Sequence, residues 1–187
     1  MIYIFMGLLA FLLFAAYDIN SVTSKKNSIK SFFFLGSFLL IVATSGIIIE
    51  SFHGIQWDLG WMSIFGICSL IFLILLIYTL FFALPFNETY VKSNATPKVY
   101  QDGFYALCRH PGVLWFIGFY LFLWLTLKIP LLLLAGIIFS GFNVMYVIFQ
   151  DHWTFPRVFE DYDEYKKMTP FIIPNFKSIK RCLQTLQ

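Results

Sequence analysis

The sequence predicts an all-α integral membrane protein with about five transmembrane helices, a tight hairpin of the last two, and a cytoplasmic C-terminal helical tail. The 187 residues are 59% hydrophobic and only 12% charged, whereas an ordinary soluble domain carries about 25% charged residues. Several apolar runs are long enough to cross a bilayer, and nearly all basic residues fall on one predicted side of it. This composition excludes a water-soluble globular enzyme, a disordered chain and a basic nucleic-acid-binding module.

Three spans are expected before the hairpin. A hydrocarbon core of about 30 Å needs roughly 17–25 apolar residues in a helix that rises about 1.5 Å per residue. The stretch 1–17 has no charge and lacks the basic start and cleavage site of a signal peptide, so we expect a retained first span. The runs 31–49 and 61–86 qualify without further argument, because charged residues flank them and none lies inside.

The fourth and fifth spans come from one long apolar run, 111–149, whose single charged residue is Lys128. As one helix this run would extend roughly 58 Å, about twice the hydrocarbon thickness. We therefore expect two spans, 111–127 and 130–149, that turn back at Lys128. Pro130 suits the first turn of the returning helix, where its missing N–H costs nothing.

The distribution of charge predicts the orientation of this single membrane domain, 1–187. Of the thirteen Lys and Arg residues, twelve lie in the connections that follow spans one, three and five. The positive-inside rule makes that side cytoplasmic, with the N-terminus outside and the C-terminus inside. Two polar stretches, 87–110 and 150–187, then lie together in the cytoplasm and are long enough to hold a site. The three widely spaced cysteines indicate neither a disulfide framework nor a metal site.

The polar stretch after the last span contains two helical patterns. Apolar residues from Val158 to Met168 recur at helical spacing after Pro156, which predicts a helix there. A second helix follows Pro174 and has the pattern of a basic amphipathic helix on an anionic leaflet. A membrane-surface anchor without chemistry would also explain this periodicity. The second helix combines apolar Phe176, Ile179, Leu183 and Leu186 with basic Lys177, Lys180 and Arg181.

The run from Gly103 to Pro111 is the most informative candidate site. Arg109 and His110 stand directly before Pro111, a residue favoured at the first position of a helix. The free N–H groups and the dipole at a helix start add partial positive charge, so the segment suits a carboxylate or phosphate at the interface. From the residues alone, an equally good interpretation is that Arg109 contacts lipid headgroups and His110 caps the helix.

Two motifs resemble those of the isoprenylcysteine carboxyl methyltransferase and phospholipid methyltransferase superfamily. One is Gly-x-Tyr-x-x-x-Arg-His-Pro before a membrane hairpin, and the other is a Tyr-x-x-Tyr-x-x-x-x-Pro tail. The resemblance covers roughly residues 90–175, and the earlier residues match only as hydrophobic spans. The motif residues are Gly103, Tyr105, Arg109, His110 and Pro111, followed by Tyr162, Tyr165, Pro170 and Pro174.

This resemblance implies an S-adenosylmethionine-dependent methyltransferase. The cofactor would bind between the hairpin and the tail, and a lipid, isoprenoid or lipidated substrate would enter from the bilayer. Arg109 would pair with the cofactor's carboxylate, aromatic faces would hold its sulfonium, and Arg109 and Asp151 are the expected catalytic residues. The expected cofactor-binding residues are Gly103, Tyr105, Arg109, His110, Pro111, Gln150, Tyr162 and Tyr165.

The chain departs from the family pattern in three places, one of which is Val158 and Phe159, where the family usually has Phe-Gly ahead of the tyrosines. The family usually continues as Arg-His-Pro-x-Tyr-x-Gly, whereas Val113 and Trp115 stand at the last two positions here. The family usually has paired glutamates after the last span, where this chain has Gln150 and Asp151. Gln150 can only orient a group by hydrogen bonds, whereas Asp151 keeps one carboxylate and has His152 beside it as a substitute base. A carboxylate substrate needs no base, because it is already a nucleophile.

Two other functions stay open. An NADPH-dependent membrane reductase of the steroid 5α-reductase type shares the hairpin and tail, but this Arg-His-Pro lacks the expected Asn-Tyr-x-Gly-Glu continuation. A non-catalytic membrane scaffold on a degenerate methyltransferase frame would account for Gln150 and Val113. Binding of S-adenosylmethionine, of NADPH or of neither distinguishes the three functions.

Overall fold

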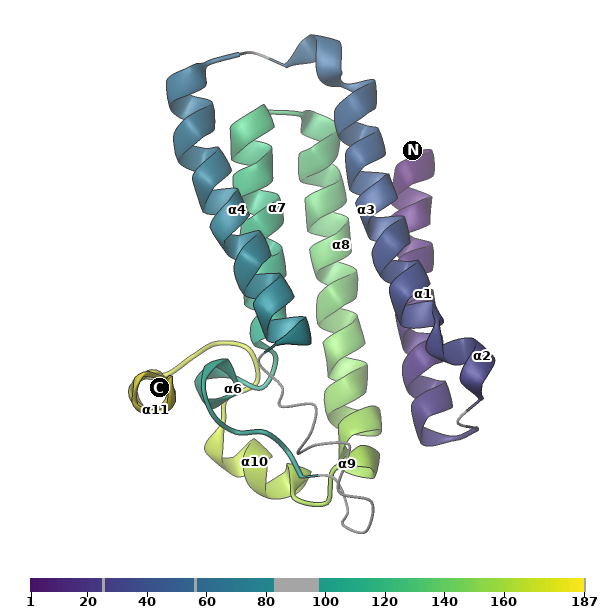
Figure 1. Cartoon of the computed structure of the whole chain (residues 1–187), viewed down its shortest axis with the longest axis vertical. Helices are drawn as coiled ribbons and strands as arrows, with labels where there is room; N and C mark the ends of the chain where they lie inside the picture. Colours follow the sequence, from purple (N-terminus) through teal and green to yellow (C-terminus); the bar gives the residue numbers. More distant parts are fainter. Residues whose placement is uncertain (25, 56, 83–97, 187) are drawn as a thin grey trace.

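The computed structural model describes residues 1–24, 26–55, 57–82 and 98–186, and every regular element in these ranges is helical. Long helices form one bundle, and most of the short helices gather at one end of it (Figure 1). The elements before the hairpin are α1 (Ile2–Val22), α2 (Asn27–Lys30), α3 (Phe32–Glu50), η1 (Phe52–Gly54), α4 (Leu59–Phe81) and α6 (Phe104–Leu107). After the hairpin come η2 (Gln150–Thr154), α9 (Phe155–Val158), α10 (Tyr162–Met168) and α11 (Phe176–Thr185).

The hairpin is formed by α7 (Pro111–Leu127) and α8 (Pro130–Phe149), at the residues expected from the sequence. Lys128 adopts the left-handed conformation, with φ 54° and ψ 29°, and so ends α7 and turns the chain back. Its ammonium lies 4.4 Å from the centroid of the Trp61 ring on α4. Pro130 stands in the first turn of α8, where it leaves no helical hydrogen bond unmade.

Within the described ranges, four helical stretches are long and apolar enough to cross a membrane: α1, Asn27–Glu50, α4 and Pro130–Val158. The prediction of an all-α membrane protein is therefore confirmed. Helix α7 is also apolar, but with 17 residues it is shorter than these four. Its length of about 26 Å is close to the core thickness of about 30 Å, and the fifth span stays a prediction.

Two predicted span boundaries differ from the structure. Helix α1 continues past residue 17 to Val22, and Asp18 is buried within it because polar side chains from α8 and η2 reach its carboxyl group. Helix α4 begins at Leu59, where Asp58 Oδ1 accepts the Trp61 N–H at 3.1 Å. Residues 83–86 of the third predicted span and 87–97 of the following polar stretch lie outside the described residues.

The bundle is held by close helix pairs. Helix α4 packs along α7, α1 packs along α3, and α8 contacts both α7 and α1. A Cβ at Gly118 of α7 would overlap the Phe72 ring of α4, so glycine permits this close approach. Thr44 of α3 and Tyr120 of α7 share a buried hydrogen bond of 2.7 Å, which satisfies both hydroxyl groups inside the apolar core.

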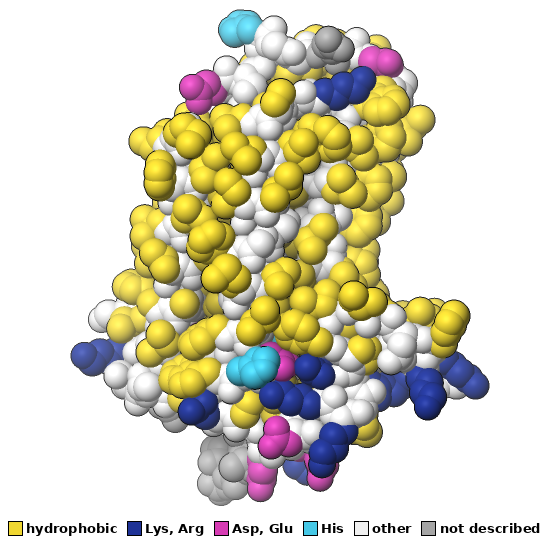
Figure 2. Space-filling model, turned by 180° about the vertical axis from the view of Figure 1, so that it is seen from behind, with side chains coloured by type: hydrophobic (Ala, Val, Ile, Leu, Met, Phe, Trp, Pro, Cys, Tyr) yellow, Lys and Arg dark blue, Asp and Glu magenta, His cyan; other side chains and the backbone are white. Residues whose placement is uncertain are grey.

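Figure 2 shows hydrophobic side chains along the length of the bundle, with charged side chains at its two ends. Large apolar residues on α1, α3 and α4 are exposed, among them Phe5, Phe38 and Ile64 at 65%, 60% and 63%. A protein in water rarely presents such a continuous apolar surface, whereas lipid tails cover it at no cost.

The helix predicted from Val158 to Met168 is wrong as a single element. The chain is extended at Phe159, with φ −112° and ψ 127°, so α9 ends there and α10 begins after Asp161. Asp161 Oδ1 accepts the Val99 N–H at 2.9 Å, a contact with a distant part of the chain. This break turns α10 back toward the start of α7.

Candidate functional site

The two motif segments meet where α7 begins and α8 ends. The Arg109 N–H donates to the carbonyl of Pro170 at 2.9 Å, and the His110 N–H donates to that of Phe171 at 3.3 Å. These bonds join residues about sixty positions apart in the sequence. The Arg-His-Pro run and the end of the tyrosine–proline tail are therefore in direct contact.

A buried carboxylate, Asp151, lies at the centre of the contact and is 2% exposed. Arg109 binds it with two bonds, Nε to Oδ1 at 2.8 Å and Nη2 to Oδ2 at 3.2 Å. The Tyr162 hydroxyl donates to Oδ1 at 2.6 Å, and His110 Nε2 lies 3.3 Å from the same oxygen. Lys166 Nζ lies 3.6 Å from Oδ2. We call these five residues the Asp151 cluster.

A π-helical turn, η2, presents Asp151 to its partners. It continues α8 without a break, and the Phe155 N–H closes it by bonding to the carbonyl of Gln150. Such turns change the direction of the side chains relative to a regular α-helix and are frequent at functional sites. Asp151 and Thr154, three residues apart in the turn, are both buried.

Arg109 is a clamp between the two motif segments. Besides its two bonds to Asp151, its Nη1 donates to the carbonyls of Lys166 at 3.2 Å and Thr169 at 2.8 Å. A guanidinium has five N–H donors, so at most one is left. The expected pairing of Arg109 with a cofactor carboxylate would have to use that single donor, and the main contacts of Arg109 are within the chain.

His110 lies between two aromatic rings. Its ring stacks on Phe155, with centroids 5.7 Å apart and planes at 11°, and meets Phe171 edge-on at 5.2 Å. Burial lowers the pKa of His110, although the hydrogen bond and the charge of Asp151 act in the opposite direction. The imidazole is therefore neutral near pH 7, and Nε2–H donates to Asp151. His110 is the N-cap residue of α7 by position, but its side chain makes no cap bond and instead faces Asp151.

The three candidate tyrosines have different positions. Tyr162 belongs to the Asp151 cluster, and burial together with its bond to Asp151 raises its pKa. Tyr165 is also buried, which raises its pKa, and its hydroxyl donates to the carbonyl of Tyr105 at 2.7 Å. The Tyr105 hydroxyl donates to the carbonyl of Thr79 on α4 at 3.1 Å. Tyr165 and Tyr105 thus connect α10, α6 and α4 beside the cluster.

Gln150 is turned away from the Asp151 cluster. Its Nε2 donates to Asp18 Oδ2 and to the Tyr146 hydroxyl oxygen, both at 2.9 Å. His152 is exposed, and its Nδ1 contacts the carbonyl of Ile148 at 2.9 Å, so the expected substitute base is not part of the cluster. The sequence signal for the Gln150 contact was Asp18, a carboxyl group at the end of an apolar run.

Gly103 and Pro111 shape the backbone around the site. Gly103 has φ 57° and ψ −131°, a conformation that other residues rarely adopt, and its N–H donates to Thr185 Oγ1 at 2.9 Å. Pro111 is buried at the start of α7, as expected. Cys108 between them is also buried, which raises the pKa of its thiol to about 12 and makes it unreactive.

Two buried polar atoms near the cluster have no hydrogen-bond partner among the described residues: Thr154 Oγ1 and Arg181 Nε. Thr154 is in η2 with Asp151, and Arg181 Nη2 bonds to the Ala106 carbonyl at 3.1 Å and to the Thr169 hydroxyl. Unsatisfied buried groups are rare in folded proteins, so these two atoms stand out as groups that can each form a further hydrogen bond. Sequence reasoning missed the roles of Thr154, Phe155, Lys166, Thr169, Phe171 and Arg181.

A surface recess elsewhere on the molecule contains none of the predicted site residues. It lies near the turn between α1 and α3, far along the chain from the motif segments. Its lining residues are Tyr17, Asn20, Ser21, Lys30 and Phe34. Arg109, His110, Tyr162 and Asp151 therefore lie together in the Asp151 cluster and not at this recess.

Comparison with known proteins gives no match: no protein-family model, no curated protein and no solved structure matches this chain. The resemblance of the two motifs stays an interpretation of the residues. The geometry of the Asp151 cluster and of the segments around it is therefore the basis for a functional assignment.

Proposed function

We propose that this protein is an integral membrane S-adenosylmethionine-dependent methyltransferase that acts on a lipid, isoprenoid or lipidated substrate. The observation that carries the proposal is the direct contact of the two motif segments through Arg109, His110 and Asp151. A cofactor site between hairpin and tail requires these segments to lie together at one end of the bundle. Their contact in the structure meets that requirement.

The proposed topology has five spans, with α7 as the fourth and α8 as the fifth, an external N-terminus and a cytoplasmic C-terminus. Twelve of the thirteen basic residues follow spans one, three and five, whereas Lys128 lies at the α7–α8 turn. In Figure 2 most of the visible Lys and Arg side chains gather at the lower end of the bundle, the end of the Asp151 cluster. The positive-inside rule assigns that end to the cytoplasm.

The residues around the cluster fit the cofactor with one change from the sequence expectation. An aromatic ring attracts a sulfonium, so we assign this group of the cofactor to the aromatic cluster of His110, Phe155 and Phe171, where the Arg109 guanidinium already lies 5.4 Å from the centroid of Phe171. Because Arg109 has at most one free donor, we assign the cofactor's carboxylate to Lys166, whose side chain is 26% exposed.

When bound, the cofactor supplies an electrophilic methyl group, and the chain's residues position the reactants and exclude water. Asp151 already accepts bonds from several donors, so it orients its neighbours and is not free to take a proton. The lowered pKa of His110 makes it a weak base. The site therefore favours an acceptor that is already anionic, such as a carboxylate, over an amine that must lose a proton.

Calorimetry with the purified full chain tests this proposal. We expect S-adenosylmethionine and its demethylated product to bind, and Lys166→Gln to weaken binding roughly tenfold, since a hydrogen bond to a charged group contributes about 1.5–3 kcal/mol. The matched control is Lys167→Gln, which removes the same charge from an exposed neighbour and should leave the affinity unchanged.

Each alternative function gives a different result in the same experiment. Binding of NADPH without S-adenosylmethionine would identify a reductase. Binding of neither ligand by the folded chain would contradict both enzymes and support the scaffold. Equal affinities of the wild type and Lys166→Gln would remove Lys166 from its assigned role.

A further inference from the structure

Helix α11 has three faces with different chemistry. The first is docked: Ser178 and Cys182 are buried, and Arg181 and Thr185 hydrogen-bond to the segment around α6. The second is an exposed apolar stripe at helical spacing, and the third carries two exposed lysines. The stripe consists of Phe176, Ile179, Leu183 and Leu186, which are 92%, 41%, 70% and 47% exposed. The lysines are Lys177 and Lys180.

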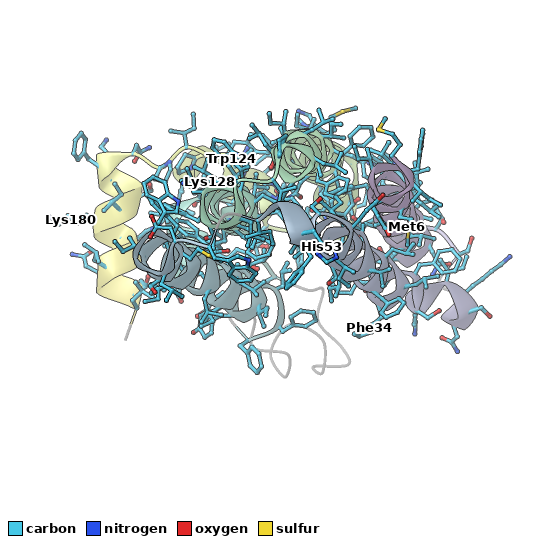
Figure 3. All side chains as sticks on the ribbon, turned by 90° about the horizontal axis from the view of Figure 1, so that it is seen from above. Met6, Phe34, His53, Trp124, Lys128 and Lys180 are labelled. Atoms are coloured by element: carbon cyan, nitrogen blue, oxygen red, sulfur yellow. The ribbon has the colours of Figure 1, made fainter. Side chains whose placement is uncertain are left out.

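The helix lies across the bundle axis. Figure 1 shows α11 end-on while the long helices run vertically, and Figure 3, a view along the bundle, shows it from the side with Lys180 on its outer side. It is at the end of the bundle where the Asp151 cluster lies (Figure 1). A helix in the plane of a membrane surface has this direction relative to helices that cross the membrane.

The chemistry of the two free faces indicates what covers them. Every charged residue of α11 is basic, and both exposed lysines are next to the apolar stripe. A second copy of the helix would bring like charges together, whereas anionic headgroups would neutralise them and the acyl region would cover the stripe. The exposed apolar surface of the bundle ends near the level of this helix, as Figure 2 shows.

We propose that α11 binds the anionic lipid surface of the leaflet at this end of the bundle and thereby holds the segment from Gly103 to Arg109 in position. The partner is a membrane surface that contains anionic phospholipid. This inference depends on the membrane location proposed above, but it does not depend on methyl transfer.

The docked face connects the lipid-binding faces to the site through a few hydrogen bonds. Arg181 Nη2 holds the Ala106 carbonyl and the Thr169 hydroxyl, and the Thr169 carbonyl accepts a bond from Arg109 at 2.8 Å. Thr185 accepts the Gly103 N–H at the start of α6. If α11 leaves the membrane surface and becomes mobile, the bonds of Arg181 to Ala106 and Thr169 and the bond of Gly103 to Thr185 weaken. Arg109 then loses the support of the segments before and after it. Anionic lipid is thus expected to order the site.

Hydrogen exchange of the full chain tests the inference in nanodiscs of phosphatidylcholine alone and in nanodiscs that also contain phosphatidylglycerol. We expect amides of α11 and α6 to exchange at least about tenfold more slowly when phosphatidylglycerol is present, because basic side chains near an anionic surface each add attraction. High salt should remove most of the difference by screening.

The matched pair of variants is Lys177→Gln/Lys180→Gln and Lys98→Gln/Lys167→Gln. Both double variants remove two exposed positive charges, but only the first removes them from α11. The first should lose the lipid effect, and the second should keep it. Equal exchange in the two nanodiscs, or protection that depends on protein concentration and not on lipid, would overturn the proposal. Protection of α11 without protection of α6 would overturn its link to the site. This exchange experiment uses no cofactor, so a negative result would not bear on the methyltransferase proposal.

Discussion

Replacing Asp151 by asparagine removes the negative charge of the Asp151 cluster while it keeps the size of the side chain. In the wild type this carboxylate is 2% exposed and neutralises Arg109, with Lys166 3.6 Å away. The asparagine amide would have to satisfy donors that a carboxylate accepts on both oxygens, and one of its own donors would face the guanidinium. Two positive charges would then lie close together without a counter-charge.

The expected loss can be estimated from this geometry. Breaking a buried ion pair by removing one partner costs about 3–5 kcal/mol, because the other charge stays buried. We therefore expect Asp151→Asn to destabilise the tail by about this amount. The matched control is Asp163→Asn on the exposed side of α10, which should change the stability by less than about 0.5 kcal/mol.

Hydrogen exchange and unfolding of the full chain in detergent measure this difference. Amides of α10, and those of Arg109 and His110 that bond to the tail, should lose protection in Asp151→Asn and keep it in Asp163→Asn. The double variant Arg109→Gln/Asp151→Asn should be less unstable than the sum of its single variants, because the pair acts as a unit. A loss of less than about 1 kcal/mol in the free energy of unfolding of Asp151→Asn, or additive effects of the single variants, would refute the role of the Arg109–Asp151 pair in joining the two segments.

Two further predictions concern Gln150 and His110. Gln150→Glu should not strengthen S-adenosylmethionine binding measured by calorimetry, because the Gln150 side chain faces Asp18 Oδ2 at 2.9 Å. The variant should lower the stability of the protein, because it places two carboxyl groups together. A large gain in affinity would instead identify position 150 as a degraded cofactor ligand. Burial lowers the pKa of His110 in the folded chain below the unfolded value of about 6.5, so the unfolded state binds the proton first and stability should fall as the pH drops below that value. His110→Gln should flatten this part of the stability–pH profile measured by unfolding, and an unchanged slope would contradict the assignment.

The helices of the hairpin could be predicted to the residue because their limits depend on local chemistry. Pro130 fixes the start of α8, and the single charge at Lys128 marks the turn. The end of α1 could not be predicted in the same way. Asp18 looked like the end of a span, but it is buried because Gln150, far along the chain, supplies a partner for its carboxyl group. Long-range partners of this kind leave no periodic signal in the sequence.

The candidate site was predicted as a set of residues but not as a set of contacts. Arg109, His110, Asp151 and Tyr162 were all named from the sequence, and the structure brings them together. Gln150 was grouped with Asp151 because the two residues stand where the resembled family usually has paired glutamates. Successive residues of a helical turn point in different directions, so Gln150 faces Asp18 of α1 and Asp151 faces the start of α7.

The hydrogen-bond partners of Arg109 could not be predicted from its motif. An Arg-His-Pro run indicates a cation beside a helix start, and it does not tell whether the donors bind a ligand or the chain itself. The answer depends on the break at Phe159, which brings the carbonyls of Lys166 and Thr169 within reach of Nη1. The helical periodicity across this region gave no sign of that break.

Binding of S-adenosylmethionine at the Asp151 cluster can be tested by ultraviolet crosslinking of the cofactor with a labelled methyl group. Peptide mapping of the full chain in nanodiscs should find the label on peptides that contain His110, Phe155 or Phe171. An excess of the demethylated product should prevent this labelling by competing for the site. Binding at the Asp151 cluster would be contradicted if the folded chain took up no label that the demethylated product prevents. It would also be contradicted if the label were found only at the recess lined by Tyr17 and Phe34.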